Sequence, residues 1–150
     1  MRRIFLAAAL LCFAASAFSQ TAYVKKYKHL ALELSGEYGI PASVILGIAI
    51  HESGAGSSRN AKLLNNHFGI VGKNKLLKEK GIRSAYKQYD DVKDSYKDFC
   101  NVIRRKRFYE TLRGESDYRK WVDAISKAGY SVIPETWKHR VLETIRRSEL

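Results

Sequence analysis

The stretch that decides the fold is Pro41-Ala-Ser-Val-Ile-Leu-Gly-Ile-Ala-Ile-His-Glu52-Ser-Gly-Ala-Gly-Ser57. From Val44 to Ile50 every residue is apolar or glycine, and a helix that is apolar on every face is a buried one. The helix ends on a histidine and Glu52, and a run of small residues follows. The stretch therefore predicts a buried central helix that carries one carboxylate to the edge of an open loop.

The carboxylate of Glu52 has two interpretations. It is either a solvated group at a helix end or a functional acid. Its predicted place at the negative end of the helix dipole disfavours a negative charge, and apolar neighbours act in the same direction. Such a position suits a side chain that donates a proton in catalysis.

The first 19 residues have the pattern of a secretory signal peptide. Arg2 and Arg3 precede a short apolar run, and small residues at Ser16, Ala17 and Ser19 suit a cleavage site after Ser19. Residues 20–150 then form a single exported domain, for which we expect no transmembrane segment and a monomeric state. Its one remaining cysteine, at position 100, is expected to be a small core residue.

The charge of the chain is strongly basic. The formal net charge is +12, and removal of the two arginines in the leader lowers it to +10. A basic surface favours polyanions, and export makes an acidic cell-wall polymer a better candidate than nucleic acid. Residues 104–107, Arg-Arg-Lys-Arg, are either a solvated loop or a contact for such a polymer.

Apolar residues at helical spacing predict five or six helices around the central one. The predicted helices cover residues 21–38, 41–52, 58–64, 92–103, 117–128 and the segment from Pro134 onward, with a turn at 108–112. Glycines and an alternating pattern predict a small β-hairpin or an irregular lobe over residues 71–90. The fold class is therefore α+β, mainly α, with a lysozyme-like helical lobe around one buried helix and a small β-hairpin lobe.

Metal and nucleophile chemistry have little support in the sequence. The pair His51-Glu52 resembles the start of a zinc-protease motif, but Ala55 stands where the second histidine is needed. The other histidines, at positions 29, 67 and 139, have no ligand spacing, and no serine or cysteine nucleophile signature is present. We therefore expect no metal site and no cofactor.

Carboxylate chemistry remains, and glycoside hydrolysis is its usual form. It needs a proton donor, which Glu52 fits, and usually a second carboxylate. Candidates for the second group are Glu79, Asp90 and Asp91. Asp91 is better explained as a helix cap, and Glu79 is either the catalytic partner or a solvated charge.

Two segments carry a resemblance to a known family. They are Glu52-Ser53-Gly54-x-Gly56-x-Ser58 and Asn65-Asn66-His67-Phe68-Gly69-Ile70. They resemble the signature of glycoside hydrolase family 73, the bacterial β-N-acetylglucosaminidases of flagellar and autolysin type that cut peptidoglycan. The resemblance continues through Tyr86–Asp98 to Gly129-Tyr130-Ser131 and covers nearly all of residues 20–150.

The resemblance implies a lysozyme-like helical lobe and a small β-lobe across a cleft, with Glu52 as the general acid. It places Asn66 and Phe68 at the cleft floor and Tyr130 near the reacting sugar. Each of these three also has a structural explanation: turn capping for Asn66, and core packing for Phe68 and Tyr130.

The sequence departs from the family pattern in the lobe. Ser84 falls near the position at which the family often has a second glutamate, and we count it among the expected substrate contacts. Glu79 can replace that glutamate only if the hairpin is shifted, and Ile133 stands where the family often has an aspartate. The second catalytic group therefore stays open between a distant base and the N-acetyl group of the substrate.

These observations predict an exported peptidoglycan hydrolase, an endo-β-N-acetylglucosaminidase acting on glycan strands through Glu52. One alternative is a muramidase or lytic transglycosylase of the same fold. Others are a non-catalytic module that binds the cell wall and a basic antimicrobial or lipid-binding protein.

Overall fold

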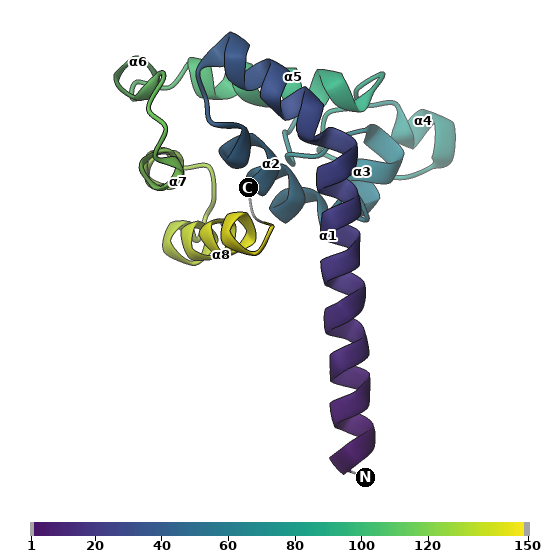
Figure 1. Ribbon diagram of the computed structural model, residues 1–150. Coiled ribbons are helices and arrows are strands. Elements are labelled where there is room, and N and C mark those ends of the chain that lie inside the picture. Colours follow the sequence, from purple (N-terminus) through teal and green to yellow (C-terminus); the bar gives the residue numbers. More distant parts are fainter. Residues whose placement is uncertain (1, 149–150) are drawn as a thin grey trace.

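The computed structural model describes the backbone of residues 2–148 and the side chains of residues 19–148. The described chain is mainly helical, as predicted (Figure 1). Its helices are α1 (Arg2–Tyr38), α2 (Ala42–Ser53), α3 (Arg59–Leu64), α4 (Leu76–Lys80), α5 (Val92–Arg104), α6 (Tyr109–Leu112), α7 (Tyr118–Lys127) and α8 (Pro134–Arg147). Helix α1 begins earlier than the predicted residue 21. The predicted signal peptide, residues 1–19, lies almost wholly outside the residues whose side chains are described, and its cleavage stays a prediction.

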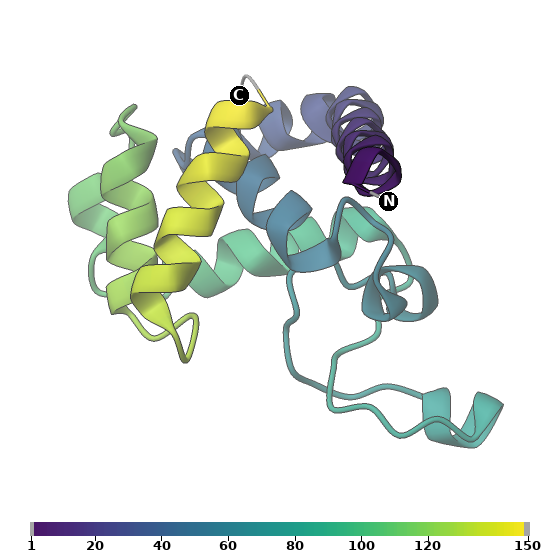
Figure 2. The ribbon, with the colours of Figure 1, turned by 90° about the horizontal axis from the view of Figure 1, so that it is seen from below.

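Helix α2 is the centre of the molecule. Its residues from Val44 to Ile50 are all buried, and α1, α5, α7 and α8 pack around it (Figures 1 and 2). Gly47 permits the closest of these contacts, because a Cβ atom at this position would lie 2.3 Å from Cγ1 of Ile145 in α8. The apolar run of the sequence therefore forms the buried helix that it predicts.

The surrounding helices begin and pack as their sequence patterns predict. Side chains of Ser58, Asp91 and Asp117 accept hydrogen bonds from the backbone at the starts of α3, α5 and α7. The apolar residues at helical spacing in these helices are buried at Ala31, Leu34, Tyr38, Tyr96, Phe99, Ile103, Trp121, Val122, Ile125, Trp137, Val141 and Ile145. Others of the same pattern, Val24, Tyr27, Val92 and Tyr118, lie half-buried at the edge of the core. Cys100 is fully buried, and burial raises the pKa of its thiol to about 12, as fits a core residue.

The segment from residue 70 to residue 89, here called the lobe, projects from the helical body (Figure 2). The predicted β-hairpin is wrong, because the described residues of the lobe form no strands. A single antiparallel bridge joins Val71 to Tyr86, and the short helix α4 occupies the tip. The alternating pattern of residues 82–89 gives an extended chain without a regular ladder.

The physical reason lies in the amide side chains of the lobe. Asn74 Nδ2 donates to the carbonyl oxygens of Ser84 and Tyr86, at 2.8 and 2.9 Å. Gln88 Oε1 accepts from the backbone N–H of Lys75 at 2.8 Å. These side chains satisfy backbone groups that a hairpin ladder would otherwise pair, so the two chains stay extended without forming strands.

Among the described residues, no helix combines the length and the apolar character that a membrane span requires.

Candidate active site

Glu52 lies in the last turn of α2, where the buried helix reaches the surface. The rest of the helix up to Ile50 is buried, but Glu52 itself is half-buried. Gly54, in a left-handed conformation, ends the helix and returns its N–H to the carbonyl oxygen of Ile50. The helix therefore places one carboxyl group at the boundary between core and solvent, as predicted.

Trp137 holds this carboxyl group from the side of α8. Its indole Nε1 donates to Oε1 of Glu52 at 2.7 Å, and the Trp137 side chain is buried. Pro134 at the start of α8 fixes where this helix begins, so that Trp137 in its first turn faces the end of α2. One oxygen of Glu52 thus has a fixed partner that can only donate a hydrogen bond.

The second oxygen faces the corner that follows α3. A Cβ atom at Gly69 would lie 3.7 Å from Glu52 Oε2 and 3.9 Å from the ring of Tyr86. The φ of Gly69 is +67°, in the region that L side chains rarely adopt, so glycine lets the backbone pass close to the carboxylate. The corner, the end of α2 and the root of the lobe therefore meet at Glu52.

Asn66 builds this corner. Its Nδ2 donates to the carbonyl oxygens of Ile70 and Lys87, both at 2.8 Å. Its Oδ1 accepts from the N–H groups of Phe68 and Ile70, at 3.3 and 3.2 Å. The buried amide is saturated by backbone groups, which fits the turn-capping explanation. A direct contact between Asn66 and substrate stays a prediction.

Phe68 and Tyr130 lie on the same side of the corner. The Phe68 ring is buried and stacks on Phe99 with ring centroids 4.3 Å apart. The Tyr130 hydroxyl donates to the carbonyl oxygen of Phe68 at 2.9 Å, and its ring lies 5.3 Å from the ring of Trp137. Burial raises the pKa of Tyr130 well above its ordinary value, and the nearby Glu52 carboxylate adds to the effect. Tyr130 is therefore a neutral hydroxyl close to Glu52, and its contact with a sugar stays a prediction.

The structure does not bring the two predicted lobe residues to the Glu52 carboxylate. Ser84 is half-buried and its Oγ accepts from the N–H of Tyr86, in a groove of about 710 Å³ on the lobe. Glu79 is exposed on α4, at the tip of the lobe (Figure 2). Among the described residues, the contacts of Glu52 are with an indole N–H and a glycine, and neither supplies a second carboxylate.

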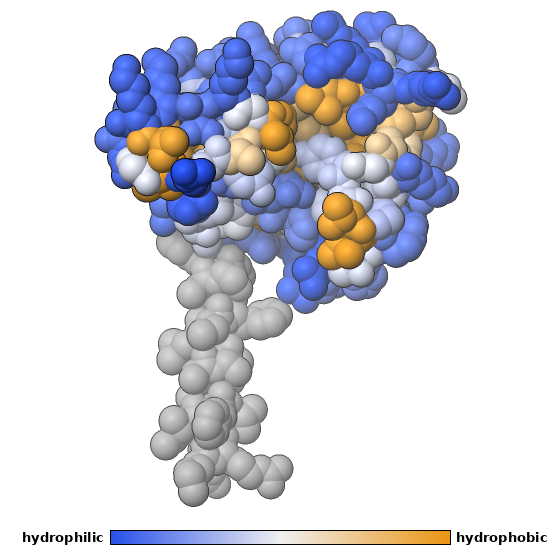
Figure 3. All heavy atoms as spheres, turned by 180° about the vertical axis from the view of Figure 1, so that it is seen from behind, coloured by the Kyte–Doolittle hydropathy of each residue, from blue (hydrophilic) through white to orange (hydrophobic). Residues whose placement is uncertain are grey.

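The lobe and the connector between α7 and α8 both project from the helical body (Figure 2). Separate apolar patches lie on the face of the molecule that Figure 3 shows. The large apolar residues that are exposed in these two segments are Val71 and Leu77 in the lobe, and Val132 and Ile133 in the connector.

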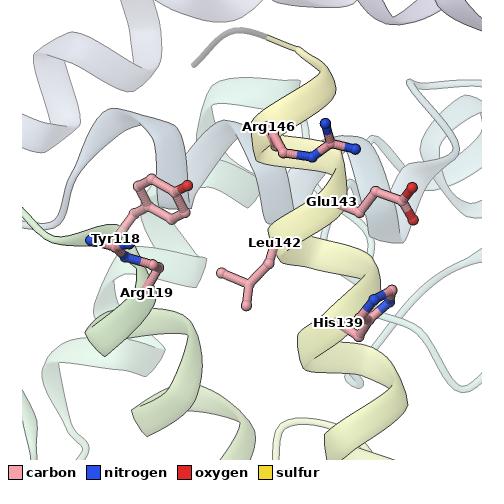
Figure 4. A pocket seen from close by; sticks show the side chains of 6 residues that line it. All are labelled: Tyr118, Arg119, His139, Leu142, Glu143 and Arg146. Carbon is pink, nitrogen blue, oxygen red and sulfur yellow. The ribbon is translucent and has the colours of Figure 1, made fainter.

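A second hollow, of about 270 Å³, lies between α7 and α8 (Figure 4). Leu142 points into it, and the polar side chains around it include Arg119, His139, Glu143 and Arg146. The carboxylate of Glu143 is ion-paired with Arg147 on the same helix. Within the described part of the chain, no group of three or more His, Cys, Asp or Glu side chains could hold a metal ion.

Sequence reasoning missed the role of Trp137 at this site, because the pattern of the last helix indicates only that it packs in the core. A buried tryptophan usually has a partner for its indole N–H, and this rule could have prompted a search for an acceptor. It could not have identified Glu52, which is 85 positions earlier in the chain.

Comparison with protein families gives one match over residues 28–150. It is to the glucosaminidase model, described as mannosyl-glycoprotein endo-beta-N-acetylglucosaminidase. No curated protein matches the chain.

Several solved structures share the fold. The catalytic domain of the autolysin Auto from Listeria monocytogenes has a TM-score of 0.70 at 20% identity, over 87% of this chain and 85% of that one. A type VI secretion effector–immunity complex from Pseudomonas protegens contains a chain with a TM-score of 0.63 at 21% identity, over 88% and 95%. A mutant peptidoglycan hydrolase from Sphingomonas sp. A1 has a TM-score of 0.64 at 21% identity, over 83% and 92%.

Proposed function

Because the chain belongs to the glucosaminidase family, whose members are glycoside hydrolases, we propose that it is an exported peptidoglycan hydrolase in which Glu52 is the general acid. The bond it cuts is the one that follows N-acetylglucosamine in the glycan strand. The family resemblance expected from the sequence is thereby confirmed, and the family match supports the enzyme class.

The observation that carries the proposal is the hydrogen bond between Trp137 and Glu52. Trp137 Nε1 can only donate, so Oε1 of Glu52 must accept in either protonation state. Because the carbonyl oxygen of a neutral carboxyl group is the better acceptor, the proton then belongs on Oε2, the oxygen that faces Gly69. The hydrogen bond thus fixes the direction in which Glu52 can donate its proton. Protonation of the leaving glycosidic oxygen requires an acid that is oriented in this way.

The second catalytic group is proposed to come from outside the protein carboxylates. An oxocarbenium-like transition state needs a nucleophile on the face opposite the acid. Glu79, the sequence candidate, is exposed at the tip of the lobe. We therefore expect either a water molecule or the acetamido oxygen of the N-acetylglucosamine unit to attack, and the anomer of the first product, followed by NMR, separates the two. Inversion indicates direct attack by water, whereas retention indicates the acetamido group.

Peptidoglycan is the proposed substrate for two reasons. One structural relative is a peptidoglycan hydrolase from Sphingomonas sp. A1, and the chain keeps a net charge of +10 without the two arginines of the leader, which attracts anionic wall polymers. Export and a monomeric state stay predictions from the sequence.

A digest of purified peptidoglycan tests the proposal. The variants are Glu52→Gln, which keeps an acceptor for Trp137 but has no acid proton, and Glu110→Gln as the control at an exposed position. Products are reduced with borohydride and identified by mass spectrometry. We expect reduced glucosamine ends from the wild type and from Glu110→Gln, and a loss of about 1,000-fold or more in Glu52→Gln.

Other products would change the assignment in defined ways. Reduced or anhydro-muramic ends would make the protein a muramidase or a lytic transglycosylase. Binding to the wall without products would make it a binding module. Full activity in Glu52→Gln would remove Glu52 from the mechanism.

A further inference from the structure

A buried polar cluster lies behind the turn that follows Glu52. It consists of Tyr23 from α1, His67 from the corner after α3, and Tyr96 from α5, and all three side chains are buried. The Tyr23 hydroxyl hydrogen-bonds to His67 Nδ1, and Tyr96 lies 2.8 Å away from the same hydroxyl. The reaction proposed for Glu52 uses none of these groups.

The cluster is uncharged near pH 7. Burial raises the pKa of Tyr23 and Tyr96 far above the ordinary value, so both are neutral hydroxyls. Burial lowers the pKa of His67 to about 4, so its ring is neutral near pH 7. We assign the ring proton of His67 to Nε2; in this tautomer Tyr23 donates to Nδ1 and its oxygen accepts from Tyr96, which gives one continuous chain of bonds.

This chain touches the turn that carries Glu52. Ser53 donates to the carbonyl oxygen of Ala49 at 2.6 Å and accepts from the N–H of Gly56 at 2.8 Å. A Cβ atom at Gly56 would lie 3.3 Å from the Tyr23 ring and 3.7 Å from the His67 ring, so the turn rests on these two rings.

We propose that Tyr23 and His67 are positioning residues for Glu52, which hold the Ser53–Gly56 turn against the last turn of α2. The proposal rests on the proposed role of Glu52 as the acid. Tyr23 is the fourth residue after Ser19, where cleavage is expected. The first residues of the exported chain would therefore help to hold the active site in place. The N-terminal helix thus contributes to catalysis without touching the substrate.

Protonation of His67 at Nδ1 would remove the acceptor of the Tyr23 hydroxyl, so the bonds of the chain could not persist in their assigned directions. The groups that face His67 are Tyr23, Tyr27 and Lys26 from α1, and Tyr96 from α5. None of them carries a negative charge that would stabilise the imidazolium, and Lys26 opposes it. The support should therefore be lost as the pH falls towards 4.

Four variants test the proposal in the full exported chain. Tyr23→Phe keeps the ring and removes the hydroxyl, and His67→Leu removes the acceptor. His67→Asn is the rescue variant, because its amide oxygen can stand where Nδ1 stands. Tyr27→Phe is the matched control, because the ring of Tyr27 packs in the same cluster but its hydroxyl is not part of the chain.

Two readouts are measured on protein that is folded at the assay temperature. The first is kcat and KM for peptidoglycan fragments against pH, and the second is hydrogen exchange of the backbone over residues 54–58. We expect Tyr23→Phe and His67→Leu to lower kcat about tenfold with KM changed less than about twofold, and to speed exchange in this segment. His67→Asn and Tyr27→Phe should stay within about twofold of the wild type at pH 7. The acid limb near pH 4 should move to lower pH in His67→Asn.

The two proposals fail in different ways. If the wild type cleaves peptidoglycan through Glu52, but Tyr23→Phe retains wild-type kcat and exchange, the positioning role is wrong. If the wild type does not cleave, the proposed function is wrong, and the exchange rates still decide whether the cluster holds the turn. A tenfold loss that His67→Asn fails to rescue, with exchange unchanged, would also overturn the positioning role.

Discussion

The helical body and the lobe are held together by different forces. In the body, α2 buries an unbroken apolar run from Val44 to Ile50 among four other helices. In the lobe half of the residues are exposed, and amide side chains such as Asn74 supplement a few backbone hydrogen bonds between the two extended chains. Apolar packing fixes atoms closely, whereas a few solvent-accessible hydrogen bonds open at lower free energy. The proposed acid therefore lies on the rigid region, and the groove on the adaptable one.

The two regions meet at a small set of polar contacts. Asn66 bonds to the carbonyl oxygen of Lys87 on the returning chain of the lobe. Lys87 and Tyr89 both contact the carboxylate of Asp98 in α5, at 2.7 and 2.8 Å. The position of the lobe over Glu52 therefore depends on these contacts more than on the interior of the lobe.

Breaking the junction at Asn66 should have the largest effect. Asn66→Ala leaves four backbone groups without their partner in a buried corner, and we expect a loss of about 4 kcal/mol in the free energy of unfolding. Urea unfolding measures it. Asn101→Ala is the control, because Asn101 is half-buried and accepts only one long bond of 3.3 Å, from Tyr38. A loss in Asn66→Ala no larger than in this control would show that packing alone holds the junction.

Acid should destabilise the body through His67. The pKa of His67 is lowered by burial from 6.5 to about 4, so the unfolded chain binds a proton between these pH values and the folded chain does not. Stability therefore falls as the pH drops from 6.5 to 4, by on the order of 3 kcal/mol from this group. Urea unfolding at several pH values measures the slope.

The His67→Asn variant isolates this contribution, because it cannot titrate in this range. The difference between wild type and variant should shrink as the pH falls and level off below 4. The exposed His139 provides a control, since His139→Gln should leave the wild-type slope unchanged. Parallel pH profiles for wild type and His67→Asn would rule out a neutral, buried His67.

Local patterns in the sequence were enough to predict most of the body. The apolar run predicts the buried helix α2, and caps such as Asp91 act on N–H groups only three residues away. The bond of Trp137 to Glu52 and that of Tyr23 to His67 join residues 85 and 44 positions apart. Nothing in a local pattern selects these pairs, because the choice depends on how the helices pack. The β-hairpin predicted for the lobe is wrong for a related reason. Its residues alternate as in a strand, but contacts between its amide side chains and the backbone, which the alternation does not reveal, decide its structure.

The closeness of α2 and α8 can be tested at Gly47. Gly47→Ala places a Cβ atom 2.3 Å from Ile145, so one helix must shift, and we expect a loss of about 2 kcal/mol. Gly36→Ala is the matched control in the exposed face of α1, where no atom lies within 4 Å. It should stabilise the protein by about 0.5–1 kcal/mol, because alanine favours the helix. Thermal unfolding of both variants compares them, and equal midpoints would mean that α2 and α8 are not in close contact.

The smallest effect is expected inside the lobe. Asn74→Ala removes the amide that bridges the two extended chains, and we expect a loss of about 1 kcal/mol or less in global unfolding. The reason is that the lobe can open without unfolding the body, so its bonds contribute little to the cooperative transition.

Local opening should nevertheless increase in Asn74→Ala. Backbone hydrogen exchange should become at least about tenfold faster over residues 72–88, while residues 44–50 of α2 exchange as in the wild type. Gln88→Ala tests the same point with a second variant, because the Gln88 side chain accepts a hydrogen bond from the Lys75 N–H across the lobe. If either variant speeds exchange equally in α2 and in the lobe, the two regions unfold as one unit, and a rigid acid beside an adaptable groove no longer describes the site.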